Sequence, residues 1–178
     1  ENVFTPTKAV IETKAKFLNL DVVVGKYSEF FEKYQPSEFF GIVVQTPDSK
    51  GVLHDFTQFF NKIDESKTKV VKVVASDLLA LTLVKAPGDM GADVCFGSAQ
   101  RFGVPMGFGG PYSGFFSTRE KNVRKMPGRI IGRSIDADNK LAYRMALQTR
   151  EQHIRREKAT SNICTAQALL ANIAAMYA

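Results

Sequence analysis

Short apolar runs alternate with amphipathic segments along most of this chain. Near-continuous apolar runs of this length are typical of strands that are buried on both faces of a parallel sheet. The pattern therefore predicts an α/β fold, with a mostly parallel mixed sheet flanked by helices. The five expected strands are Asp21–Val24, Gly41–Gln45, Val70–Ala75, Ala92–Phe96 and Gly114–Thr118.

Two segments repeat their apolar residues at helical spacing. Pro6–Leu20 follows Thr5, a suitable N-cap, and places proline at the first helical position. The second helix is expected within Leu53–Ile63. The side chains expected to be buried are Ala9, Val10, Thr13, Phe17 and Leu20 in the first segment and Phe56, Phe59, Phe60 and Ile63 in the second.

The last third of the chain has a different character. We expect Gly128–Asp138 to be an exposed loop and Arg144–Arg156 to be a basic, helix-like stretch. An apolar helix is expected over Cys164–Ala178.

The length of 178 residues is enough for one domain with its own core. We interpret residues 1–178 as one domain, and both ends as cuts in a longer protein. No apolar run approaches the roughly 20 residues that a membrane helix needs. The two cysteines, Cys95 and Cys164, are expected to be buried, reduced thiols, and His54 is expected on the surface.

The net charge of +6 is concentrated in one segment. Residues 1–118 carry 12 basic and 13 acidic side chains, whereas residues 119–158 carry 12 basic and 5 acidic ones. Such a segment can meet nucleic acid, an acidic protein, or a ligand with phosphate and carboxylate groups. It has no nucleic-acid-binding motif, so we expect no nucleic-acid partner.

Glycines crowd together between Gly97 and Gly114. Their spacing does not match a dinucleotide-binding fingerprint, because Pro111 falls where such a loop would turn into its helix, and no P-loop lysine follows. We expect these glycines to permit tight backbone turns beside a site or a partner.

Four segments carry a family resemblance. They are GADVCFGSAQRFGVP (91–105), GFGGP (107–111), MPGRIIG (126–132) and QTREQHIRREKATSNICT (148–165). Together they resemble the amino-terminal half of the glycine decarboxylase family, the P-protein of the glycine cleavage system. The similarity runs from about Thr5 to the last residue, and the first 70 residues match only loosely.

The resemblance implies part of the large domain of a fold-type I transferase that depends on pyridoxal phosphate. It also implies glycine as substrate, decarboxylation, and transfer of the aminomethyl group to the lipoyl arm of the H-protein. The expected compartment is the mitochondrial matrix in a eukaryote and the cytoplasm in a bacterium. The expected partner is the carboxy-terminal half of the same enzyme, whether fused or a second subunit, with no membrane involved.

The cofactor lysine of the family is missing here. Counted from the strand Gly91–Asp93, its position falls at Arg101, and arginine cannot form an imine with the cofactor. The carboxylate that pairs with the pyridine nitrogen should lie near Val74 or Ala75, but the acidic residue is Asp77. We therefore expect a degenerate copy of the catalytic fold, which is inactive alone and whose cofactor is held by the other half. Ser98 is a candidate for a hydrogen bond in this vestigial site.

A degenerate copy can still complete a neighbouring site. Thr160, Ser161 and Asn162 resemble a turn that relatives extend toward the cofactor phosphate of the adjoining domain, and a turn that opens a helix suits a dianion. The alternative is that Thr160 and Ser161 only cap the following helix.

Arg150, His153 and Arg156 are candidates for substrate binding or for the interface. An arginine fork matches the carboxylate of glycine, and His153 could exchange a proton near neutral pH. The alternative is a structural helix whose charges pair with Glu151 and Glu157. For the whole chain, the rival interpretation is a non-enzymatic scaffold that binds an acidic partner through its basic segment.

Overall fold

The computed structural model describes residues 1–147, 154, 156–158 and 165–178. The chain divides into two compact units. The first unit comprises Glu1–Ser117 and Leu169–Ala178, and the second unit comprises Thr118–Ala168. That all 178 residues belong to one large domain stays a prediction.

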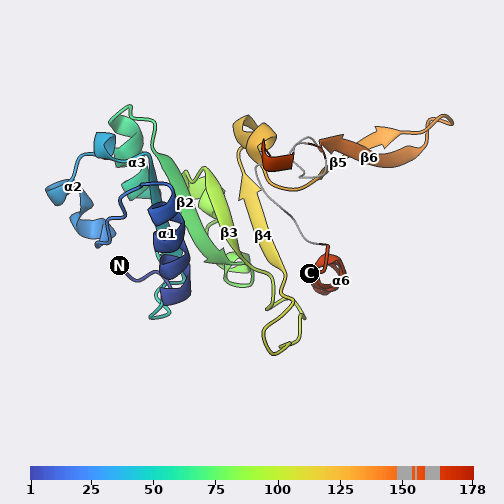
Figure 1. Ribbon diagram of the computed structural model, residues 1–178, viewed down its shortest axis with the longest axis horizontal. Coiled ribbons are helices and arrows are strands. Elements are labelled where there is room, and N and C mark those ends of the chain that lie inside the picture. Colours follow the sequence, from blue (N-terminus) through green and yellow to red (C-terminus); the bar gives the residue numbers. More distant parts are fainter. Residues whose placement is uncertain (148–153, 155, 159–164) are drawn as a thin grey trace. The chain divides into compact units, whose positions relative to one another are not determined.

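The first unit is built on a four-stranded sheet, of which Figure 1 shows β2 and β3 in green and β4 in yellow. Its strands β1 (Gly41–Thr46), β2 (Val71–Asp77), β3 (Val94–Ser98) and β4 (Gly114–Thr118) lie side by side in sequence order. β1 and β2 are parallel, as are β2 and β3, whereas β4 runs in the opposite direction (Figure 1). The predicted mostly parallel, mixed sheet flanked by helices is confirmed.

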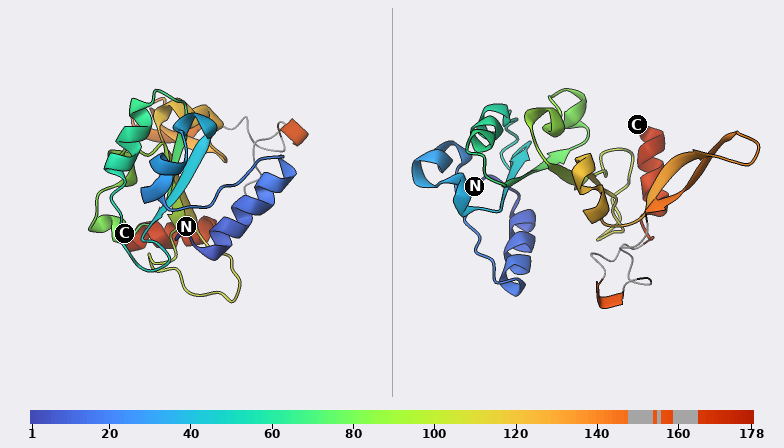
Figure 2. Two further views of the ribbon diagram at one scale, coloured as in Figure 1. Left: turned by 90° about the vertical axis from the view of Figure 1, so that its left-hand side faces the viewer. Right: turned by 90° about the horizontal axis from the view of Figure 1, so that it is seen from above.

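Helices lie on both faces of this sheet. Figure 2 shows α1 on one side and α3 on the other. The helices of this unit are α1 (Thr5–Phe17), α2 (Phe30–Lys33), α3 (Thr57–Glu65), α4 (Pro87–Met90) and α6 (Ala168–Tyr177), with 3-10 turns at η1 (Tyr27–Glu29), η2 (Pro36–Glu38) and η3 (Ala80–Thr82).

The main core lies between α3 and the sheet. As the spacing predicted, Phe60 and Ile63 of α3 are fully buried, and Phe56 is buried just before the helix begins. They pack against Val44 of β1 and Val74 of β2. A smaller cluster joins α6 to the segment after β3, through Ala174, Ala99 and Val104.

Several predictions for the first 24 residues are wrong. Asp21–Val24 lies in the described part of the chain and has no regular secondary structure, since a β-branched run becomes a strand only where it has a partner. In α1 the N-cap is Phe4 rather than Thr5, and the helix ends at Phe17. Only Ala15 of α1 is buried, while Val10 and Phe17 are exposed.

The second unit contains a hairpin that the sequence did not predict. β5 (Ile130–Ile135) pairs antiparallel with β6 (Leu141–Leu147), after the 3-10 turn η4 (Glu120–Lys125). The expected loop at Gly128–Asp138 is thus largely a strand, and Arg144 lies in β6 rather than in a helix. The two segments are strands because they pair with each other about ten residues apart, and neither segment by itself indicates this pairing.

The carboxy-terminal prediction is confirmed over Ala168–Tyr177, where α6 forms. Cys164 lies outside the described residues, as do residues 148–153 and 155 of the basic stretch. Within the described part of the chain, no helix is long and apolar enough to cross a membrane.

Candidate functional site

The residues of the predicted vestigial site lie where β2 and β3 end. Asp77 is the last residue of β2 and Ser98 the last residue of β3, and the two are paired in the parallel register. The carboxyl ends of parallel strands meet at one edge of the sheet, which is where ligands bind in folds of this kind. Arg101 follows in the turn after β3.

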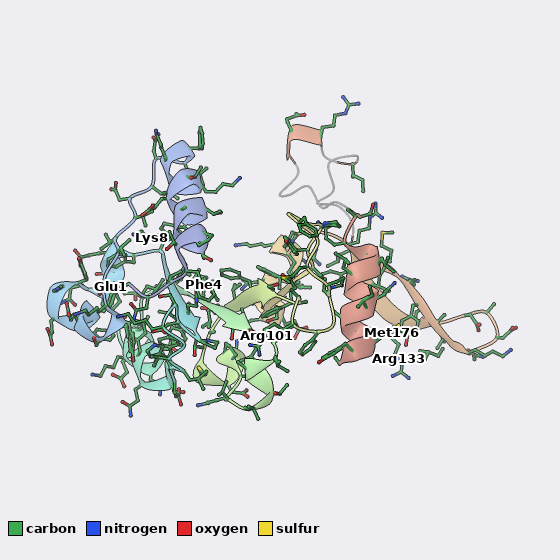
Figure 3. All side chains as sticks on the ribbon, turned by 90° about the horizontal axis from the view of Figure 1, so that it is seen from below. Glu1, Phe4, Lys8, Arg101, Arg133 and Met176 are labelled. Carbon is green, nitrogen blue, oxygen red and sulfur yellow. The ribbon has the colours of Figure 1, made fainter. Side chains whose placement is uncertain are left out.

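An ion pair occupies this edge. Arg101 Nη1 donates to Asp77 Oδ2 over 3.0 Å. The other carboxylate oxygen accepts the backbone amides of Leu79 and Ala80, at 2.8 and 3.1 Å, and is thereby held at the start of η3. Figure 3 labels Arg101 among the side chains at this end of the sheet.

Ser98 has a local role in the described structure. It is exposed, and its Oγ accepts the backbone amide of Gln100 over 3.1 Å. This bond holds the start of the turn that carries Arg101.

These residues do not fit a covalently held cofactor. Arginine stays protonated and cannot form the imine that pyridoxal phosphate chemistry needs, and the carboxylate of Asp77 is already engaged by Arg101 and two amides. Lys72 cannot replace Arg101, because it lies near the opposite end of β2 and its Nζ pairs with Asp64 Oδ1. Among the described residues, no group of three or more His, Cys, Asp or Glu could hold a metal ion.

The remaining predicted site residues are only partly described. Arg156 is exposed and begins the short 3-10 turn η5 (Arg156–Lys158). The other candidates, Arg150, His153, Thr160, Ser161 and Asn162, lie outside the described residues. The structure therefore joins Arg101 to Asp77, with Ser98 beside Asp77 in the strand register. The roles of the basic segment and of the turn stay predictions.

A second cluster of polar groups follows β1. The carboxylate of Asp48 is buried, and His54 Nε2 lies 2.9 Å from its Oδ2. The Oδ1 atom accepts the amides of Lys50 and Val52 at 2.8 and 2.9 Å, and Asn2 Nδ2 donates to Oδ2 at 3.1 Å. His54, expected on the surface, is thus largely buried, with 19% of its side chain exposed.

This cluster holds a loop in place. The hydrogen bond from His54, together with the amides of Val52 and Lys50, keeps the pKa of Asp48 well below its usual range, against the opposing effect of burial. An ionised carboxylate only accepts hydrogen bonds, so His54 Nε2 carries the proton. Both carboxylate oxygens of Asp48 therefore accept hydrogen bonds from groups of this chain. The sequence signal was the turn Pro47–Gly51, in which an aspartate folds back onto following amides.

The glycine-rich stretch after β3 forms tight turns. Gly103, Gly109 and Gly110 have positive φ angles of 71°, 110° and 121°. Gly97 is needed for another reason, since a Cβ there would overlap the carbonyl oxygen of Ser76 and lie 2.6 Å from Cε1 of Phe115. The tight turns predicted from the glycine-rich stretch are confirmed.

The sequence is similar to known proteins over its whole length. Residues 1–178 match the family described as Glycine cleavage system P-protein. Proteins named glycine dehydrogenase (decarboxylating) are 53% identical over 178 residues in Idiomarina loihiensis and 57% identical over 172 residues in Photobacterium profundum. These alignments cover 100% and 97% of this chain, but 18% and 17% of the relatives.

A solved structure shares the fold. It is a crystal structure of glycine decarboxylase (P-protein) of the glycine cleavage system, in inhibitor-bound form, and is 33% identical with a TM-score of 0.84. The match covers 99% of this chain and 40% of the solved chain. The α/β architecture of the first unit is therefore one already known in a glycine decarboxylase.

Proposed function

We propose a function for this chain from the premise that it belongs to the glycine cleavage system P-protein family, to which it is matched over its whole length. The chain is part of a glycine dehydrogenase (decarboxylating), and it serves as the non-catalytic half. Pyridoxal phosphate, the electron sink of such enzymes, is held by the other half. The aminomethyl group left from glycine passes to the lipoyl arm of the H-protein.

The observation that carries this proposal is the ion pair between Arg101 and Asp77. It replaces the lysine and the aspartate that a cofactor site of this fold requires, and each of the two residues satisfies the other. A domain with such a pair can scaffold the enzyme and complete a site, but it cannot hold the cofactor covalently.

The turn after the basic segment, and the basic segment itself, supply the contribution to the neighbouring site. Thr160, Ser161 and Asn162 offer hydroxyl and amide donors to the cofactor phosphate. Arg150 and Arg156 offer guanidinium groups to the carboxylate of glycine, and His153 a titratable ring. Ser98 stays with the vestigial edge, where it supports the turn of Arg101.

The same charge distribution underlies the rival function, a non-enzymatic scaffold for an acidic partner. The basic segment, residues 119–158, falls in the second unit. The identity of more than half of all positions with bacterial glycine dehydrogenases supports the enzyme instead. The bacterial source of those relatives also favours the cytoplasm over the mitochondrial matrix.

Cofactor mapping tests the proposal. The complete enzyme is incubated with pyridoxal phosphate, reduced with borohydride and digested, and the labelled peptide is sequenced. We expect the label on a lysine outside residues 1–178. A stoichiometric label on any peptide of residues 1–178 would overturn the assignment of this chain to the non-catalytic half. If the complete enzyme does not decarboxylate glycine in an activity assay, the proposed activity is wrong.

A further inference from the structure

The hairpin of the second unit has one apolar face that the described residues of this unit leave exposed. In the register of β5 and β6, Ile131 lies opposite Met145, Arg133 opposite Tyr143, and Ile135 opposite Leu141. Residues that face each other in an antiparallel pair, and residues two apart on one strand, point to the same side of the sheet. These six side chains therefore form one face, which we call the hairpin face.

The hairpin face is strongly exposed. Its five apolar residues are between 42% and 71% exposed, and Arg133, labelled in Figure 3, is exposed at its centre. The opposite face differs, because the small residues Gly132, Ser134 and Ala142 lie there half-buried, beside the exposed Arg144. The large exposed apolar side chains are thus concentrated on the side that the described residues of the second unit leave uncovered.

A hairpin of this composition needs a partner. A two-stranded hairpin is at best marginally stable in water, and it becomes stable when one apolar face packs against another element. Here the strands are six and seven residues long, with a single irregularity between Ile130 and Ile131. Their length and the exposed apolar face both point to a surface that is buried in the functional protein.

We propose that the hairpin face packs against a part of the glycine dehydrogenase polypeptide outside residues 1–178. The choice of occupant rests on the proposed function and on length, since the chain spans only about 18% of its curated relatives. The occupant has an apolar surface, and it carries a carboxylate opposite Arg133, because a buried guanidinium must be paired.

Site-specific photo-crosslinking in the complete enzyme tests this proposal. The photo-reactive residue p-benzoylphenylalanine replaces Tyr143 on the hairpin face, or Asp138 in the hairpin turn as the matched control. Both side chains are largely exposed in this chain. We expect position 143 to give crosslinks to peptides outside residues 1–178 in much higher yield than position 138.

Three results would overturn the proposal. Crosslinks from position 143 only to the first unit would show that the hairpin face packs against this chain itself. Crosslinks only between identical peptides of two copies, detected by mixing isotope-labelled with unlabelled enzyme, would show a dimer contact, and a yield no higher than at position 138 would show no specific contact.

Thiol alkylation is a second test that does not depend on the bulky photo-reactive residue, which could itself prevent assembly of the enzyme. In the complete enzyme, Tyr143→Cys should be alkylated at least about tenfold more slowly than Asp138→Cys, because the covered thiol reacts only after local opening. Equal rates would contradict the proposal. Neither readout uses catalysis, so a protected hairpin face in an enzyme that does not decarboxylate glycine would separate failure of the proposed function from failure of this inference.

Discussion

Arg101 and Asp77 lie 24 residues apart in the sequence, and they form an ion pair of 3.0 Å across the ends of two adjacent parallel strands. The pair lies at the carboxyl end of the strands, the edge at which ligands bind in open α/β sheets. Its two members have unequal roles, because Asp77 also accepts two backbone amides.

Because Asp77 makes more hydrogen bonds than Arg101, substitutions of the two residues should lower the free energy of unfolding by different amounts. Arg101→Gln removes only a partly exposed ion pair, so the free energy of unfolding should fall by roughly 0–1 kcal/mol. Asp77→Ala also removes the acceptor of the amides of Leu79 and Ala80, which should add about 1 kcal/mol. Urea unfolding of both variants measures the difference, and a larger loss for Arg101→Gln would contradict this account.

The buried carboxylate of Asp48 predicts acid sensitivity. Its pKa is lowered in the folded protein, chiefly by the hydrogen bond from His54. A lowered folded-state pKa stabilises the protein above the unfolded value of about 3.9, and this stabilisation is lost as the pH falls below it. Melting temperatures measured downward from pH 6 should therefore drop more steeply for the wild type than for Asp48→Asn. The exposed Asp21→Asn is the control and should follow the wild type.

Gly97 predicts a severe steric effect. A Cβ at this position meets the backbone of β2 and the ring of Phe115, and neither can move away without disturbing the sheet. Gly97→Ala should therefore lower the free energy of unfolding by about 1–3 kcal/mol. Gly25→Ala is the matched control, because a Cβ there has no atom within 4 Å. Similar stabilities of the two variants would show that the strands approach less closely than described.

Cys95 should be an inert thiol in the native protein. It is buried in β3, and burial raises its pKa to about 11. Because the thiolate is the reactive species, iodoacetamide at pH 8 should leave Cys95 unmodified until the chain is unfolded. Peptide mass spectrometry separates this residue from Cys164. Rapid native modification of Cys95 would show that the centre of the sheet opens readily.

Thr160 tests the contribution of the turn to the neighbouring site. Thr160→Val keeps the shape of the side chain and removes its hydroxyl. If that hydroxyl contacts the cofactor phosphate, the dissociation constant for pyridoxal phosphate in the complete enzyme should rise about tenfold to hundredfold, for a loss on the order of 1.5–3 kcal/mol.

A helix cap alone would behave differently. It would lower the stability by roughly 1 kcal/mol and leave the cofactor affinity unchanged. Measuring the affinity and the melting temperature of the same variant therefore separates the two roles of Thr160.

Local pattern alone determined much of the first unit. Phe59, Phe60 and Ile63 recur at helical spacing, and the apolar runs at β1, β2 and β3 are each long enough for a buried strand. The family resemblance, rather than local pattern, placed the expected lysine at position 101, where an arginine side chain cannot form an imine in any fold.

Tertiary structure decided whatever depends on a partner distant in the sequence. Val22 and Val23 have the composition of a strand but no strand to pair with, whereas Ile131 and Tyr143 lie in strands because their two segments pair with each other. His54 carries no local sign of burial, and it is enclosed only because Asp48 and the aromatic rings of Tyr27 and Phe56 surround it. Spacing along a chain encodes which face of an element is apolar, but hydrogen-bond pairing and burial arise from contacts that form only when the whole chain has folded.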